Sequence, residues 1–231
     1  METEFTPFMK DLESRFKSAS GLPNRSHYKI FYGQIRPAPI LTLGINPGGD
    51  PSNTDPDGLR HKDGKFAAVS ASYFENDKHD ILDCEWKENN GLRKILIPLL
   101  GNDTRRIRSE VVKSNLAFHR SARASQIKVK NAIDESAPFL AEIIDVVRPK
   151  LILLTGPKMS LFTDRFSSNV TIVGQPEKDP GVKQTVFAAA QVILRGSELE
   201  VLVVQVAHAS QFSWTYERYS VVDKIHALTN Y

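Results

Sequence analysis

The apolar residues of the chain gather in two kinds of pattern, short continuous runs and longer segments with helical spacing. Continuous runs, which are typical of buried strands, occupy 39–44, 111–117, 151–154, 185–194 and 199–206. Helix signals mark the first 36 residues, where Gly21-Leu22-Pro23 breaks the run, and then 91–100, 134–147, the segment opened by Gly156-Pro157, and about 213–228. Because helical segments alternate with apolar runs, the pattern predicts an α/β fold, a three-layer α/β/α sandwich whose central sheet is mainly parallel.

Residues 46–90 break this pattern, since they form a long polar stretch with few periodic apolar positions. A loop of this length inside a compact domain is usually functional, carries small helices of its own, or is disordered. The chain contains no internal repeat and no low-complexity linker, so a single domain over 1–231 is the economical interpretation.

Composition narrows the class of protein. Hydrophobic residues make up 41% and charged residues 25% of the 231 positions, as in soluble proteins with a buried core. No apolar run approaches the roughly 20 residues of a membrane helix, and the amino terminus lacks the layout of a secretory signal. The lone Cys84 excludes a disulfide framework and an all-cysteine metal or iron–sulfur site within one chain. We expect a cytoplasmic monomer that does not contact membranes.

The net charge of +3 is too small to indicate a polyanionic partner, but its distribution is uneven. Residues 111–133 contain no acidic side chain. Basic residues within or just before this segment are Arg105, Arg106, Arg108, Lys113, Arg120, Arg123, Lys128 and Lys130. Such a cluster can neutralise phosphates, and it can equally be an ordinary solvated surface.

Three of the apolar runs lead directly into polar residues. The first ends in GINPG at 44–48, the second contains Asn115, and the last is followed by HAS at 208–210. In open α/β sheets, ligands bind outside the carboxyl ends of the strands. If the sheet is parallel at these strands, Asn46, Asn115 and His208 converge on one cleft.

These motifs resemble the two signatures of the uracil-DNA glycosylase superfamily. Gly44-Ile45-Asn46-Pro47-Gly48 is similar to the GxNPG sequence of the mismatch-specific and single-strand-selective branches. His208-Ala209-Ser210, at the end of a late strand, is similar to the second signature, usually HPS or NPS. The central segment Arg148-Pro149-Lys150, followed by an apolar run, also resembles that family. The similar pieces extend from about residue 39 to 213.

The resemblance implies a hydrolase that flips an altered base out of DNA and cleaves its N-glycosidic bond, without metal or organic cofactor. Asn46 would hold the attacking water, and His208 would donate to the base oxygen as negative charge grows there. Asn115 would read the Watson–Crick edge of the base. The other residues expected to contact substrate are Gly44, Ile45, Pro47, Gly48, Ser210 and Phe66, the last as a stacking aromatic.

Several positions depart from the family pattern. Ala209 replaces the proline of the second signature, and asparagine in the first signature leaves the site without a strong general base. Phe66 lies farther from the first signature than the family's stacking aromatic usually does. The long loop 51–90 is a candidate to remodel the pocket, so the target can be an altered base other than uracil.

Other interpretations of the same residues stay open. GINPG can be a tight turn, His208 a buried structural histidine, Asn115 a turn cap and Phe66 ordinary packing. For the whole chain, the alternatives are a non-catalytic nucleic-acid-binding protein that retains the fold, and a hydrolase of a small nucleotide or nucleoside. GxSxG, dinucleotide-binding and P-loop patterns are absent from the sequence, and the His, Asp and Cys residues of 61–84 fit no zinc spacing.

Overall fold

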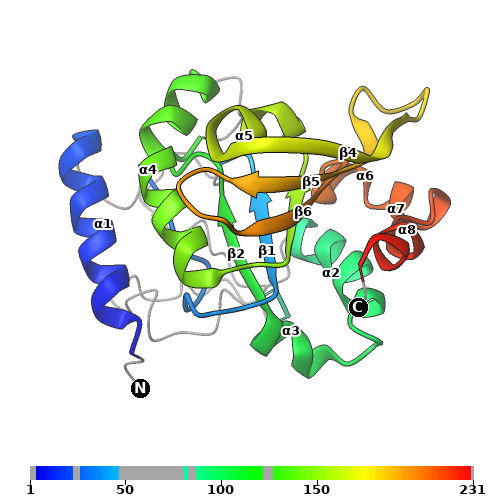
Figure 1. Ribbon diagram of the computed structural model, residues 1–231, viewed down its shortest axis with the longest axis horizontal. Coiled ribbons are helices and arrows are strands. Elements are labelled where there is room, and N and C mark those ends of the chain that lie inside the picture. Colours follow the sequence, from blue (N-terminus) through cyan, green and yellow to red (C-terminus); the bar gives the residue numbers. More distant parts are fainter. Residues whose placement is uncertain (1–3, 23–26, 47–80, 83–86, 122–126, 230–231) are drawn as a thin grey trace, which may run out of the picture.

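The computed structural model of the chain describes residues 4–22, 27–46, 81–82, 87–121 and 127–229. Its centre is a six-stranded sheet in the order β2-β1-β3-β6-β5-β4 (Figure 1). The strands are β1 (Ile40–Gly44), β2 (Val111–Asn115), β3 (Leu151–Thr155), β4 (Ser167–Lys178), β5 (Thr185–Leu194) and β6 (Glu200–Val206). The first four in this order are parallel, and β5 and β4 are antiparallel to their neighbours. The prediction of a mainly parallel α/β sheet is thus confirmed.

The apolar runs became strands because they are buried on both faces of the sheet. Every residue of β1, β2 and β3 is buried, as expected for parallel strands covered by helices on two sides. Successive side chains point to opposite faces, so Leu41 and Leu43 join one hydrophobic cluster while Ile40 joins the other.

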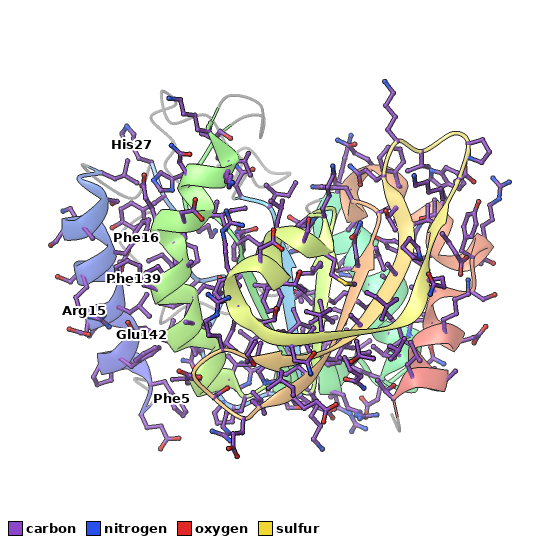
Figure 2. All side chains as sticks on the ribbon, turned by 45° about the horizontal axis from the view of Figure 1, so that its top comes forward. Phe5, Arg15, Phe16, His27, Phe139 and Glu142 are labelled. Carbon is purple, nitrogen blue, oxygen red and sulfur yellow. The ribbon has the colours of Figure 1, made fainter. Side chains whose placement is uncertain are left out.

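One face of the sheet is covered by α1 (Thr6–Ser20), α4 (Val129–Val147) and α5 (Met159–Phe166) (Figure 1). In Figure 2, Phe16 of α1 points toward Phe139 of α4, and their ring centroids lie 5.4 Å apart in an edge-on arrangement. On the outer surface of the same two helices, Arg15 donates two hydrogen bonds to the carboxylate of Glu142, at 2.8 and 2.7 Å. An apolar contact lined by a charged pair therefore joins the amino-terminal helix to the sandwich.

The opposite face carries α2 (Lys87–Leu99), α3 (Thr104–Glu110), α6 (Ala209–Phe212), α7 (Trp214–Arg218) and α8 (Val221–Leu228). The backbones of α2 and α6 approach so closely at Gly91 that an added Cβ would lie 2.1 Å from the carbonyl oxygen of Ala209. Gly91 therefore sets the position of α2 against the residues that follow β6. None of the helices in the described part of the chain is both long and apolar enough to cross a membrane.

Some predicted boundaries were wrong. Helix α1 ends at Ser20 before the left-handed Gly21, as the predicted break at 21–23 requires, but the described residues 27–38, which were also expected to be helical, contain no helix. Helix α4 begins at Val129, five residues earlier than predicted, and continues through Pro138. The carboxyl-terminal helix is two helices, since Ser220 between α7 and α8 has a φ of 46°.

Strand β4 and the short helix α3 were missed. Most residues of β4 are exposed or half-buried, and Ile172 and Val173 are among the exposed apolar side chains of the molecule. An edge strand of this kind lacks the continuous or alternating apolar pattern that reveals buried strands.

Candidate functional site at the carboxyl ends of the parallel strands

The register of the parallel strands places their carboxyl ends at one level of the sheet. Gly44 of β1 lies opposite Asn115 of β2, and Thr155 of β3 lies opposite Val206 of β6. Leu43 pairs with Leu154, so Gly44 and Thr155 are at the same level as well. The sheet is thus parallel at these strands and their carboxyl ends lie at one end of the sheet, which is the condition on which the predicted convergence of Asn46, Asn115 and His208 depends.

Gly44 allows the side chain of Asn115 to lie directly over strand β1. A Cβ at Gly44 would stand 2.5 Å from Oδ1 of Asn115, a distance that no real side chain tolerates. Nδ2 of Asn115 donates a hydrogen bond of 2.8 Å to the hydroxyl of Tyr32, and both side chains are buried. Burial raises the pKa of Tyr32, so its phenol stays neutral near pH 7. The amide of Asn115 thus points its nitrogen at Tyr32 and its oxygen toward Gly44.

A charged pair lies beside this amide. Oε1 of Glu88, from the first turn of α2, lies 3.2 Å from the position of a Cβ at Gly44. Oε2 of Glu88 lies 3.3 Å from Nζ of Lys113, whose side chain is only 3% exposed. Nζ of Lys113 also donates to Oδ1 of Asn89 at 2.8 Å and lies 4.6 Å from the ring centre of Tyr32. We call Tyr32, Gly44, Glu88, Lys113 and Asn115 the strand-end cluster.

His208 lies two residues after the end of β6, and three contacts hold it in place. Its main-chain N–H donates to Oε1 of Gln184 at 2.8 Å. Its ring packs on Gly156, where an added Cβ would lie 2.8 Å from Cδ2. Nδ1 of the ring accepts the main-chain N–H of Ser210 at 3.3 Å and lies 2.9 Å from Oγ of Ser210. Because a main-chain N–H only donates, Nδ1 is the acceptor and Nε2 carries the proton of the neutral ring.

The charge state of His208 follows from its surroundings. Burial lowers the pKa of His208, with Glu88 acting to raise that pKa and Lys113 acting to lower it. The ring is therefore neutral near pH 7 and offers one hydrogen-bond donor, Nε2–H. The sequence predicted that Ser210 contacts substrate. In the structure, Ser210 holds the ring of His208 through Nδ1.

Asn46 lies on the opposite side of the site from His208. Beyond β1, Ile45 accepts a hydrogen bond of 2.8 Å from the main chain of Ala117. The residues after β1 therefore lie beside the residues that follow β2. There, Nδ2 of Asn46 donates to Oγ of Ser121 at 3.0 Å. Strand β3 separates the strands that precede Asn46 and His208, so those two strands lie about 10 Å apart.

Three predicted substrate-binding residues, Pro47, Gly48 and Phe66, lie outside the described residues. Most of the loop 51–90, including Cys84 and the histidines of 61–79, also lies outside them. Within the described ranges, no group of three His, Cys, Asp or Glu side chains gathers as metal ligands would.

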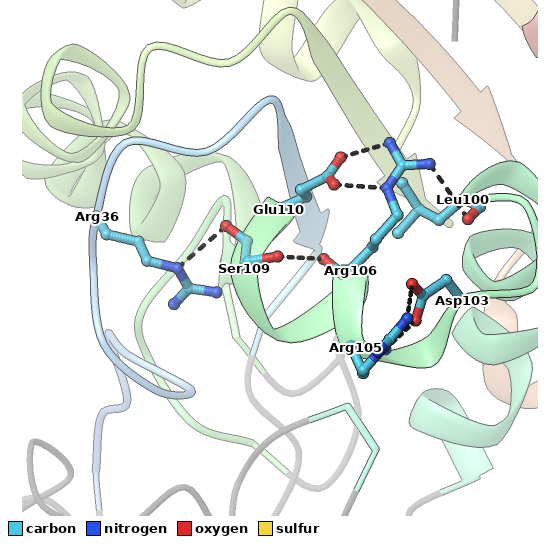
Figure 3. Close-up of polar contacts among 7 residues, drawn as sticks. All are labelled: Arg36, Leu100, Asp103, Arg105, Arg106, Ser109 and Glu110. Carbon is cyan, nitrogen blue, oxygen red and sulfur yellow. Dashed lines mark hydrogen bonds and ion pairs between the residues drawn. The ribbon is translucent and has the colours of Figure 1, made fainter.

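The basic cluster of the sequence is divided in space. Lys113 and Arg120 are buried. Arg105 is paired with Asp103 and Arg106 with Glu110, as Figure 3 shows. Lys128, Lys130 and Arg108 are exposed, and Arg123 lies outside the described residues. In the part of the chain that is described, the run of basic residues is thus divided among buried, paired and exposed side chains.

Sequence reasoning missed two members of the site. Tyr32 lies in a segment expected to be helical, and Glu88 lies in the long polar stretch that carries no local signal. Lys113 was noted only for its charge, although a lysine two residues before Asn115 in a buried strand must share its face of the sheet.

No protein-family model matches the chain, and no curated protein matches it at a significant level.

Proposed function

We propose that the chain is a DNA glycosylase, a hydrolase that cleaves the N-glycosidic bond of an altered base flipped out of DNA. The observation that carries this proposal is the register of the parallel strands, which brings Gly44, Asn115 and the residues before His208 to one end of the sheet. A site built at that edge by separate strands is the usual ligand site of an open α/β sheet.

In the proposed reaction, His208 stabilises the leaving base. The glycosidic bond lengthens, positive charge develops on the sugar, and the electron pair of the bond moves onto the base. Because Nδ1 is held by Ser210, Nε2–H is the donor that the neutral ring has left, and it would donate to the base oxygen. A preorganised donor of this kind contributes about 2.7–4 kcal/mol to transition-state stabilisation.

Asn46 would position the water that attacks the sugar. Its hydrogen bond to Ser121 fixes the plane of the amide, with Nδ2 toward Ser121 and Oδ1 directed away from it. Oδ1 would accept a hydrogen bond from the water, the oxygen of which forms the new bond to C1′. The proton of the water passes to solvent, and the products are the free base and an abasic sugar.

The test is release of bases from oligonucleotides that carry uracil or other altered bases, detected by alkaline cleavage at abasic sites. We expect single-turnover release by the wild type, and a loss of 100-fold or more in Asn46→Ala and His208→Ala, which is the size of effect seen when one oxyanion donor is removed. Asn169→Ala on β4 and His226→Ala on α8 are the matched controls and should keep full activity.

Binding of the same oligonucleotides separates an enzyme from its closest rival. An enzyme loses turnover in the two variants and retains DNA binding. A folded wild type that binds DNA with strong salt dependence but releases no base from any substrate would overturn the proposal and identify a binding protein.

A further inference from the structure

We propose that the strand-end cluster selects an altered base that keeps an exocyclic amino group, because two acceptor oxygens lie against the same glycine at the end of β1. The acceptors are Oε1 of Glu88 and Oδ1 of Asn115. This inference rests on the proposed function, since it concerns the base that the same site would bind.

The two oxygens converge on one point of the structure. A Cβ at Gly44 would lie 2.5 Å from Oδ1 of Asn115 and 3.2 Å from Oε1 of Glu88. The absence of a side chain at Gly44 lets both oxygens lie this close to the backbone at the end of β1. Glu88 belongs to α2 and Asn115 to β2, so the fold brings together two residues that are distant in the sequence.

The orientation of each oxygen is fixed by a partner on its other side. Tyr32 accepts from Nδ2 of Asn115 at 2.8 Å, which turns Oδ1 away from Tyr32 and toward Gly44. Nζ of Lys113 lies 3.3 Å from Oε2 of Glu88 and balances the carboxylate charge, which leaves Oε1 as the oxygen nearer Gly44. A carbonyl group of a base would need a donor such as Nδ2 of Asn115. That nitrogen already donates to Tyr32.

An acceptor pair discriminates between bases by their hydrogen-bonding edge. Cytosine and adenine present an amino group, which donates, where uracil and hypoxanthine present a carbonyl oxygen. A carbonyl facing Glu88 would be repelled by the carboxylate and would leave a buried acceptor without a partner. The Glu88 side chain is 23% exposed and forms the outer member of the pair, so it is the one an entering base meets first.

The experiment uses two matched pairs of bases that differ in amino against oxo substitution and all carry the O2 oxygen that His208 would contact: cytosine with uracil, and 5-methylcytosine with thymine. Each is placed in an oligonucleotide with a 2′-fluorinated sugar that resists cleavage, and binding to the full chain is measured by fluorescence anisotropy. We expect the wild type to bind the amino member at least 10-fold more tightly in at least one pair.

Glu88→Gln is the decisive variant, because glutamine offers a donor as well as an acceptor in the same volume. The preference should fall below about 2-fold or reverse, while binding of an abasic oligonucleotide stays unchanged. Glu135→Gln, which alters a carboxylate paired with His119 outside the cluster, should keep the wild-type preference. A thermal unfolding scan of each variant confirms that it is folded.

Two results would overturn this inference and leave the proposed function intact: base release by a wild type that prefers the oxo bases, or an unchanged preference in Glu88→Gln. Competition between free cytosine and free uracil, followed by ligand-observed NMR, gives an answer that does not depend on catalysis. Equal binding of the two free bases, or binding of neither, contradicts the selection of an amino group, whereas failure to release any base contradicts the proposed function.

Discussion

At the scale of single residues, the site depends on glycines that let polar side chains lie against the backbone. Gly44 makes room for Asn115, and Gly156 makes room for the ring of His208. In both cases a hydrogen bond holds the neighbouring side chain, from Asn115 to Tyr32 and from Ser210 to His208, so the side chain cannot move away from an added methyl group without losing that bond.

Gly44→Ala should displace Asn115 and destabilise the protein by about 1–3 kcal/mol, which is usual for overpacking of a buried site. The measurement is the midpoint of denaturant unfolding. Asn115→Ala in the same chain should recover part of the loss, because it removes the atom that the new Cβ meets. Equal and additive losses in the double variant would show that the two residues do not interact.

His208 makes stability depend on pH in a defined direction. Because burial lowers its pKa in the folded state from the ordinary value of 6.5, the unfolded chain takes up a proton first as the pH falls. The free energy of unfolding should therefore decrease as the pH falls through about 6.5, and this decrease stops below the folded-state pKa. His208→Gln should lack that part of the pH dependence. Unfolding curves of both proteins between pH 5 and 8 check this prediction, and identical slopes would refute it.

At the scale of elements, helix α2 connects the strand-end cluster to the residues after β6. Glu88 is in its first turn, and Gly91, one turn later, contacts the backbone of Ala209. The close contact between the backbones of Gly91 and Ala209 thus fixes the position of α2 relative to α6.

Gly91→Ala should separate α2 from α6, because the added Cβ would meet a carbonyl group 2.1 Å away. We expect a destabilisation of about 1–3 kcal/mol or more, and a loss of any base-release activity that exceeds the loss of stability, since Glu88 and His208 move with the two helices. Lys94→Ala, farther along the same helix, serves as control. Retention of both stability and activity in Gly91→Ala would disprove the contact.

The sequence predicted buried strands well and exposed strands poorly. Runs such as 151–154 are apolar because they are buried in the middle of the sheet, and they were recognised with an error of one or two residues. Strand β4 is exposed and was missed. The strand ends of the site followed from the parallel sheet, but the contact of Glu88 with Gly44 depends on where α2 packs, and no local pattern encodes that position.

At the scale of the whole molecule, the two helical layers contribute differently. The layer of α1, α4 and α5 has an apolar interior and lies on the face of the sheet away from the strand-end cluster. The layer that contains α2 and α6 carries the polar groups of the site. We therefore expect substitutions in the first layer to change stability with little direct effect on ligand selection.

Phe16→Ala tests this division. The ring of Phe16 is fully buried and makes edge-on contacts with Tyr28, Phe118 and Phe139. Its removal should cost about 3–5 kcal/mol in the free energy of unfolding. At a temperature where the variant is folded, its preference among bases should equal that of the wild type. A changed preference would indicate that the two layers are coupled.

The position of β6 has a consequence for how the protein is made. This strand is the last of the six in the chain, yet it lies in the middle of the sheet between β3 and β5. During synthesis, the edge of β3 that pairs with β6 therefore has no partner strand until more than 200 residues have left the ribosome. Long-range pairing of this kind is slow and exposes strand edges to other chains. Nascent chains stalled before residue 200 should consequently bind holdase chaperones, and release from them should coincide with emergence of β6.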